Sequence, residues 1–572
     1  MYKKYLTFSA LIRYNIVSYI FCEICMTIKK EKAIEMKKEI QLDQNGKRKF
    51  GTADKLAYAA GDFGCNMSFA LKNTVQTFWI AYMFMNTKLL GWLVLATQIW
   101  DAINDPLIGS LIDSDRRKYK MGKFKTYILL GACGLLIAGA LVFLPLPESI
   151  RLSQETFHVV LKSTVFVLAY VIWDAFYTVA NVPYGSMLSL VSDDKGEQAQ
   201  LSTWRSIGSM IGNIVPTLVL PLLIWQKLTY DGSGKIPMLD GTYHADPDGN
   251  AYKIGDQMVN PLTGEGAEIL LGQRVFWAAL IMGVLGFIAF IFMIKKITIR
   301  VDENTVKTNE NGENVNIFKA FGKFMRNRPA VGATVAAMGM FLGMQSASTA
   351  NTIMFATYFG MPKLATYAMA IGFMPMIMFV PFIKKIVEKY GKKEASVVGT
   401  LLSVAGGIIM IFFPMLENKI AGLVVYIIGL VVFGIGLGIY NCVSWAMMGD
   451  AIDYNEWKFG TREEGTVYSL HSFFRKLSQG AGASGVLFLM GWLGYKSELG
   501  IIGQTPKTIH NMCWLVAGLY LFSAIVQFIG LALIYNLDKK TLTKMSKDLK
   551  RDVEADDIFV TATADDHIAP IH

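Results

Sequence analysis

The chain has little charge for its length. Only 17% of its 572 residues are Asp, Glu, Lys or Arg, whereas 53% are hydrophobic. Soluble globular proteins carry about 25% charged residues, so an ordinary soluble protein is excluded. Cysteine is also scarce, with six residues, and those in apolar segments stand singly, without the spacing of a zinc site or a disulfide framework. We expect them to be small buried residues.

A basic groove lined with stacking aromatic residues is missing too, so the net charge of +10 does not indicate nucleic-acid binding. The basic residues gather instead in alternate loops, at 116–125, 384–393 and 539–547. Cytoplasmic loops of membrane proteins carry such an excess of Lys and Arg. We therefore expect these loops and both termini on the cytoplasmic side of the plasma membrane, and the loop 227–273 outside.

Apolar segments of about 20 residues, the length that crosses a bilayer, recur along the chain. They predict an all-α, multi-pass membrane protein with twelve transmembrane helices in two six-helix bundles. The helices are expected near 56–84, 89–112, 126–147, 159–190, 200–226, 274–295, 331–359, 363–383, 396–414, 421–447, 466–494 and 511–536.

The two halves of the chain echo one another. Gly122-Lys123 follows the second predicted helix and Gly391-Lys392 follows the eighth, and a polar stretch separates the halves. Paired six-helix halves are typical of transporters of the major facilitator type. The predicted division is a cytoplasmic N-terminal segment 1–50, a first bundle 51–297, a linker 298–328, a second bundle 329–537 and a cytoplasmic tail 538–572. Residues 1–35 are expected to carry no function, with the native chain beginning near Met36.

Two aspartates lie one helical turn apart within the apolar segment 89–112. Asp101 and Asp105 are its only charged residues, and a charge at bilayer depth costs about 2.5–3.5 kcal/mol on insertion scales, so we infer a functional reason. Both carboxylates share a helix face with Asn104. Such a pair binds either Na⁺ or a proton. The alternative is a structural ion pair with Lys72, Arg205 or Lys476.

Polar residues inside other predicted helices are the candidate substrate contacts, since charges in a membrane usually face a shared, water-filled cavity. Arg205 and Lys476 suit hydroxyl groups or a carboxylate; the alternative is that they snorkel to headgroups or pair with the aspartates. His471 and Asp62 have the alternative of being satisfied core residues. The full candidate set is Asp62, Asn66, Tyr177, Asn181, Arg205, His471 and Lys476.

An acidic segment at the end of the tenth predicted helix is expected on the same membrane side as the basic loop 116–125. Salt bridges between the two would close the inner face, and breaking them would open it. The alternative is a solvated loop. The predicted gating residues are Asp113, Arg116, Arg117, Asp450, Asp453, Glu456 and Arg462.

These segments together resemble the glycoside-pentoside-hexuronide:cation symporter family, which includes melibiose permease and glucuronide carriers. The matching stretches are 55–58, 61–64, 100–106, 122–125, 204–205, 450–458, 468–469 and Lys476, and they span about 55–540. The resemblance implies a twelve-helix major facilitator bundle that transports sugar together with Na⁺, Li⁺ or H⁺. An enzyme is not expected, because the paired carboxylates lie within an apolar helix. We expect a monomer in the bilayer, with no cofactor beyond the transported Na⁺ or H⁺.

Carried over to this chain, the resemblance places the cation at Asp101, Asn104, Asp105 and Thr178, and the sugar at Tyr177, Arg205 and Lys476. Melibiose permease has aspartates at the positions of Asn66 and Asn181, an aromatic residue at that of Gly185 and a glutamine at that of His471. Losing two carboxylates makes the pocket less negative, which favours a hexuronide or another acidic glycoside. The alternatives are a neutral xyloside or glucoside, or a lipid carrier of the same fold, which the polar pocket disfavours.

Overall fold

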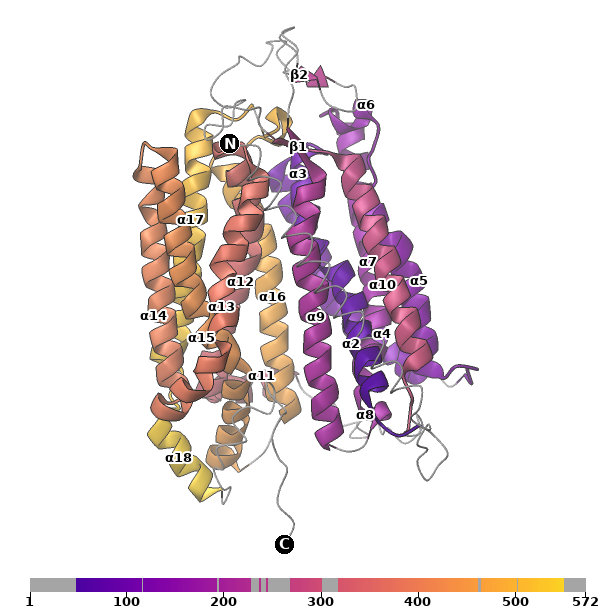
Figure 1. Ribbon diagram of the computed structural model, residues 1–572, viewed down its shortest axis with the longest axis vertical. Helices are drawn as coiled ribbons and strands as arrows, with labels where there is room; N and C mark the ends of the chain where they lie inside the picture. The colour runs from indigo at the N-terminus through magenta and orange to yellow at the C-terminus, as the bar shows by residue number, and fades with distance from the viewer. Residues whose placement is uncertain are drawn as a thin grey trace, which may run out of the picture.

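The computed structural model describes residues 48–115, 117–192, 195–227, 236–237, 243–244, 268–300, 317–460, 464–501 and 503–549. These residues are almost entirely helical (Figure 1). Most of the predicted segment 1–50, part of the predicted linker and the end of the predicted tail lie outside the described residues.

The helices form two groups along the chain. The first group contains α2 (Thr52–Phe69), α3 (Lys72–Ala81), α4 (Thr87–Ser114), α5 (Lys123–Leu141), α6 (Glu148–Arg151), α7 (Thr156–Ser186), α8 (Leu188–Val191), α9 (Lys195–Ile224) and α10 (Gly272–Lys296). The second contains α11 (Ile317–Arg326), α12 (Arg328–Tyr358), α13 (Pro362–Tyr390), α14 (Lys392–Ile411), α15 (Lys419–Phe459), α16 (Glu464–Trp492), α17 (Pro506–Phe528) with a π-helix over Ile529–Ile534, and α18 (Lys539–Asp548).

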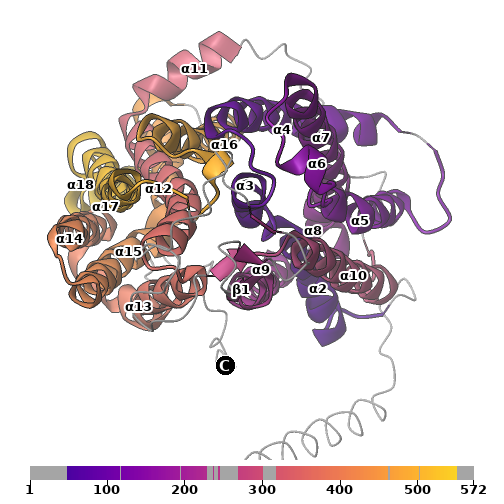
Figure 2. The ribbon, with the colours of Figure 1, turned by 90° about the horizontal axis from the view of Figure 1, so that it is seen from above.

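Figures 1 and 2 show the two groups side by side, the first running from indigo through magenta and the second from pink through orange to yellow. Between the groups, α4 packs against α16, α3 against α12, and α9 against α13. We call them the first and second bundles.

Eight helices in the described part of the chain are long and apolar enough to cross a membrane: α5, α7, α9, α10, α12, α14, α15 and α17. The other long helical segments are α4, α13, α16 and the broken pair α2–α3, and they pack among these eight helices (Figure 2). Polar residues within α4, α16 and α2–α3 lower the hydropathy of these segments. The all-α membrane fold is thus confirmed, while the count of twelve crossings stays a prediction.

Several helix boundaries differ from the prediction; for example, α13 ends at Tyr390 and not near 383, and α5 ends at Leu141 and not near 147. The first predicted helix is interrupted after Phe69 and resumes at Lys72. In addition, α15 continues past the predicted end at 447 to Phe459, where Gly460 adopts a left-handed φ of +70° and donates its N–H to the Glu456 carbonyl. Hydropathy marks where the apolar run ends, whereas the helix itself ends at the glycine that can take this conformation.

Short strands occupy the described part of the loop between α9 and α10, which the prediction left without structure. Strand β1 (Trp225–Lys227) pairs antiparallel with β4 (Glu268–Leu270), and β2 (Ile236–Pro237) with β3 (Tyr243–His244). The β4 strand reaches the second bundle, because Glu268 N donates to the Gly360 carbonyl at 3.0 Å and its carboxylate lies 3.0 Å from Lys363 Nζ. We call this end of the molecule the β end; α8, α11 and α18 lie at the opposite end (Figure 1).

Glycine allows a close contact between two helices of the first bundle. At Gly208 of α9, an added Cβ would overlap the carbonyl oxygen of Ala59 on α2. Because backbone atoms cannot move aside as a side chain can, any larger residue would push α2 and α9 apart. The two helices carry Asp62 and Arg205, so this contact also positions candidate site residues.

We predict that Gly208→Ala destabilises the protein by about 1–3 kcal/mol, the usual cost of overpacking. Thermal unfolding of the purified protein in detergent measures this as a lower melting temperature. Gly518→Ala in α17 is the matched control, because nothing lies within 4 Å of its added Cβ. Equal melting temperatures for the two variants would contradict the role of this contact.

Candidate functional site

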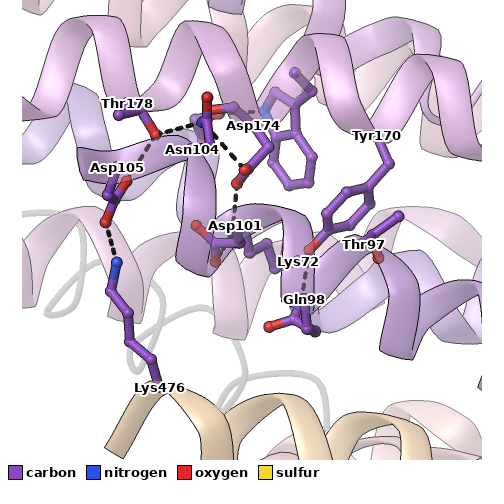
Figure 3. Close-up of polar contacts among 12 residues, drawn as sticks. Lys72, Thr97, Gln98, Asp101, Asn104, Asp105, Tyr170, Asp174, Thr178 and Lys476 are labelled. Carbon is purple, nitrogen blue, oxygen red and sulfur yellow. Dashed lines mark hydrogen bonds and ion pairs between the residues drawn. The ribbon is translucent and has the colours of Figure 1, made fainter. Parts of the chain in front are cut away.

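The four predicted cation ligands lie together where α4 packs against α7 (Figure 3). Asn104 Nδ2 donates to Thr178 Oγ1 at 2.9 Å, and Thr178 Oγ1 donates to Asp105 Oδ1 at 2.9 Å. Asp101 precedes Asp105 by one turn of the same helix. The spacing of the sequence and the packing of α4 on α7 therefore bring all four oxygen-bearing side chains to one place.

Asn104 has an oxygen that none of the described residues satisfies. Its side chain is 1% exposed, and its Oδ1 has no hydrogen-bond partner among them. Its Nδ2 faces Thr178 and lies 3.4 Å from Asp174 Oδ2. A buried carbonyl oxygen without a donor costs free energy, and it is the type of ligand that a hard cation prefers.

Both aspartates of the pair form ion pairs. Lys72 Nζ lies 3.6 Å from Asp101 Oδ2, and Lys476 Nζ contacts Asp105 Oδ2. The Lys476 contact joins the second bundle to the first. The structural ion pairs that we considered as an alternative are therefore present for Lys72 and Lys476, whereas Arg205 pairs elsewhere.

Lys72 has a second acidic partner and an aromatic enclosure. Its Nζ lies 3.3 Å from Oδ1 of Asp174, whose side chain is fully buried. The rings of Phe69, Tyr170, Trp173 and Tyr177 have their centroids 5.4–5.8 Å from the same nitrogen. Carboxylates and ring faces both favour an ammonium ion. Tyr177, predicted to touch sugar, thus contacts Lys72 in this arrangement.

A second polar cluster joins α2 to α9. Arg205 Nε lies 3.2 Å from Asp62 Oδ1, and Asn66 Nδ2 donates to Asp62 Oδ2 at 3.0 Å. Asn213 Nδ2 donates to Asn66 Oδ1 at 2.6 Å, and the Arg205 guanidinium lies 5.2 Å from the Tyr184 ring centroid. Asp62 therefore joins two other predicted sugar residues, Asn66 and Arg205. Asn213 was not predicted, because a single asparagine in α9 carries no distinctive spacing.

Two other predicted sugar residues lie on α16 and α7. His471 is buried on α16, with its Nδ1 2.9 Å from Thr334 Oγ1 of α12. Asn181 lies on α7, one turn beyond Tyr177. Among the described residues, neither of them forms a hydrogen bond with Arg205, and their roles stay predictions.

A cavity of about 50 Å³ lies between the bundles, beside Asp101 and Lys72. Its lining includes four neutral amides, Gln76, Gln98, Gln345 and Gln479. Gln76 also bridges the bundles, since its Nε2 donates to the Ala483 carbonyl at 3.0 Å and its Oε1 accepts from Thr349 Oγ1 at 2.7 Å. These amides were not predicted, because an uncharged side chain costs less in an apolar helix and stands out less.

The predicted gating residues are only partly described. Lys392 Nζ lies 2.9 Å from Asp450 Oδ1, and both residues belong to the second bundle. Asp453 and Glu456 follow along α15. The side chain of Asp113, together with Arg116 and Arg462, lies outside the described residues. Asp450 thus forms its salt bridge with Lys392 of its own bundle, and not with a described residue of the loop 116–125. The gate stays a prediction.

An unpredicted acid lies next to Arg117. Asp115 accepts hydrogen bonds from Tyr119 Oη at 2.5 Å and Tyr127 Oη at 2.6 Å, and from the Arg117 backbone N–H at 2.9 Å. The hydrogen bonds from Tyr119 and Tyr127 lower the pKa of this carboxyl to about 2. Asp115 is therefore negatively charged at physiological pH, and it organises its own loop.

Comparison with protein families gives one match over most of the chain. The profile of the family described as MFS/sugar transport protein matches residues 57–539. The match contains every described residue of the two clusters.

Among curated relatives, the chain is 27% identical to the uncharacterized symporter YjmB of Bacillus subtilis, over 86% of this chain and 94% of that protein. It is 24% identical to the isoprimeverose transporter of Lactiplantibacillus pentosus, over 87% and 91% of the two chains. It is also 24% identical to the glucuronide carrier protein homolog of Escherichia coli, over 80% and 86%.

A solved structure of the nucleoside transporter NupG is similar in fold. Its TM-score is 0.52 at 13% identity, covering 85% of this chain and 100% of that one. At this identity the similarity concerns the fold alone.

We predict that neutralising Lys72 or Asp174 singly destabilises the protein more than neutralising both. Lys72→Met leaves Asp101 and Asp174 without this partner, and breaking a buried pair costs about 3–5 kcal/mol. Lys72→Met/Asp174→Asn removes one charge of each sign, so its melting temperature should return most of the way to that of wild type. Exposed Lys88→Met is the control for loss of a lysine. Additive losses in the double variant would show that the two charges do not depend on each other.

Proposed function

This sugar transporter belongs to the MFS/sugar transport protein family, and we propose that it carries a hexuronide or another acidic glycoside together with a monovalent cation. The family resemblance predicted from residues 55–540 is confirmed. So are the conclusions that the chain is a multi-pass membrane protein and that it is not an enzyme. The symport itself, its ion and its substrate class are the proposal.

The observation that carries the cation half is the group of oxygens from Asp101, Asn104, Asp105 and Thr178, with Asn104 Oδ1 lacking a partner among the described residues. A cation arriving here competes with Lys476 for Asp105. Because Lys476 belongs to the second bundle, this competition would link cation binding to the contact between bundles. Binding of the cation would then change the affinity for the sugar, and binding of the sugar would change the affinity for the cation.

The acidic substrate is supported by Arg205. Its Nε bonds to Asp62, and a guanidinium has five N–H donors, so its terminal nitrogens suit bidentate binding of a carboxylate. Asn66 adds hydrogen-bonding capacity where melibiose permease has a carboxylate. The relative named as a glucuronide carrier homolog agrees with this choice.

A neutral xyloside or glucoside is the second candidate. Asp62 balances the charge of Arg205 at 3.2 Å, which leaves this cluster neutral. The relative named as an isoprimeverose transporter supports this alternative. A lipid carrier of the same fold is disfavoured, because the polar lining of the cavity suits hydroxyl groups better than an acyl chain. Uptake of labelled lipid tests that alternative.

We propose alternating access as the mechanism. The bundles touch at the β end through Gln76, Glu268 and Lys363, and in the middle through Asp105 and Lys476. Substrate and cation would bind between the bundles, which then rock about this region. The transporter would work as a monomer in the plasma membrane, with both termini in the cytoplasm and without a cofactor.

We predict that Asp101→Asn and Asp105→Asn each abolish uphill sugar accumulation, because each removes a carboxylate from the cation group. Accumulation in cells or proteoliposomes against a sugar gradient measures this. Downhill exchange should be less affected, since it needs no ion gradient. Glu417→Gln, an exposed carboxylate between α14 and α15, is the matched control. Full gradient-driven accumulation in both aspartate variants would remove the cation assignment.

The substrate class is tested by uptake into proteoliposomes of a glucuronide and a neutral glycoside, each driven separately by a Na⁺ gradient and a pH gradient. The proposal expects the glucuronide to be accumulated at least about tenfold better, corresponding to roughly 1.4 kcal/mol of selectivity. Arg205→Lys should reduce that preference, because an ammonium cannot bind a carboxylate as a fork. Better uptake of the neutral glycoside would favour the second candidate.

A further inference from the structure

Lys72 lies where a free cation would be expected. Its ammonium is 3.6 Å from Asp101 and 3.3 Å from Asp174, and its side chain is only 12% exposed. Four aromatic rings cover the same nitrogen. This enclosure has the two features that bind a monovalent cation in a dry site, namely negative oxygens and ring faces.

The charges in this region have a definite balance. Three carboxylates, Asp101, Asp105 and Asp174, face two ammonium groups, Lys72 and Lys476. One formal negative charge is therefore left for the transported ion. Among the described residues, the phenols of Tyr170 and Tyr177 on α7 also face Lys72, and Asp62 and Cys65 of α2 act electrostatically on Tyr177.

Three of the oxygens that Na⁺ would need are engaged, whereas Asn104 Oδ1 has no partner among the described residues. Asp101 Oδ2 faces Lys72, Asp105 Oδ1 accepts from Thr178, and Asp105 Oδ2 contacts Lys476. A sodium ion needs several oxygens at once, and taking those of Asp101 would require Lys72 to leave a carboxylate inside the bundle. A proton needs a single oxygen.

We propose that Lys72 is a built-in cation that fills the Asp101 part of the site, so that the transporter does not use Na⁺ and takes a proton at Asp105 instead. This inference rests on the proposed symport and names its ion. A proton on Asp105 Oδ2 removes the negative charge that holds Lys476. The same proton therefore weakens the bridge between the bundles, which couples protonation to their separation.

Asp174 has a definite part in this arrangement. Its fully buried carboxylate gives Lys72 a second partner, which holds the ammonium beside Asp101. Removing Lys72 and Asp174 together leaves the net charge of the region unchanged and frees the oxygens of Asp101. The double variant Lys72→Met/Asp174→Asn should consequently acquire a sodium site.

The test is the melting temperature of the purified full-length transporter, without sugar, in NaCl against choline chloride at equal ionic strength. An ion that binds the folded state raises the melting temperature. Wild type should melt at the same temperature in both salts. The double variant should melt a few degrees higher in NaCl. Lys72→Arg keeps the positive charge and should respond like wild type.

Two results would overturn the proposal. One is a rise of the wild-type melting temperature in NaCl as large as that of the double variant, because Na⁺ would then bind despite Lys72. The other is a double variant that melts near wild type in choline chloride yet does not respond to NaCl. A double variant that fails to fold leaves the wild-type measurement to decide, since a sodium response there suffices to reject the inference.

Transport separates this inference from the symport on which it rests. In wild-type proteoliposomes, a pH gradient without Na⁺ should drive sugar accumulation, and a Na⁺ gradient at fixed pH should not. Accumulation driven by Na⁺ would keep the symport and reject the inference. If neither gradient drives accumulation while downhill exchange proceeds, both the symport and the assignment of the proton are wrong. The melting experiment then tests only whether Lys72 excludes Na⁺.

Discussion

A charge inside the bilayer must be neutralised within the protein, and the rest of the structure depends on how this chain does so. Lys72 is neutralised by Asp101 and Asp174, Lys476 by Asp105, and Arg205 by Asp62. Each pair joins different helices, so each restricts which helices can be neighbours. The first pair requires α3 beside α4 and α7, the second joins α4 to α16, and the third joins α2 to α9. Helix packing and site chemistry are therefore decided by the same contacts.

Only the Lys476 pair crosses between the bundles among these three, and this gives it a different consequence. The pairs of Lys72 and Arg205 can persist while the bundles move, whereas the bridge from Lys476 to Asp105 must change. Neutral contacts, such as that of Gln76 with Ala483, join the bundles nearer the β end. The bridge from Lys476 to Asp105 depends both on the charge of Asp105 and on the distance between the bundles. An ion that alters this charge therefore acts on the contact between the bundles.

Much of the site could be predicted from residues that stand out energetically. Asp101 and Asp105 stand out because charge is costly in an apolar helix, and their spacing places Asn104 on the same face. Lys72 was predicted only as an alternative partner of the aspartate pair. Its pairing with Asp174 could not be predicted, because Asp174 lies 102 residues away in the sequence. Gln76, Gln98, Gln345 and Gln479 could not be singled out, because a neutral amide in a helix gives no sign of which side it faces. Short strands such as β1 and β4 were missed for a related reason, since three residues carry no periodicity.

The sequence by itself determined the class of molecule: apolar segments of membrane length, a polar stretch between two similar halves, and an aspartate pair on one helix face. These properties follow from hydropathy and from spacing within a helix, which are local. Only the tertiary structure decided which acid neutralises which base, because the partners lie on different helices, as Asp105 and Lys476 do on α4 and α16. Neutralisation depends on distances of a few ångströms through space, and no local pattern of residues specifies these.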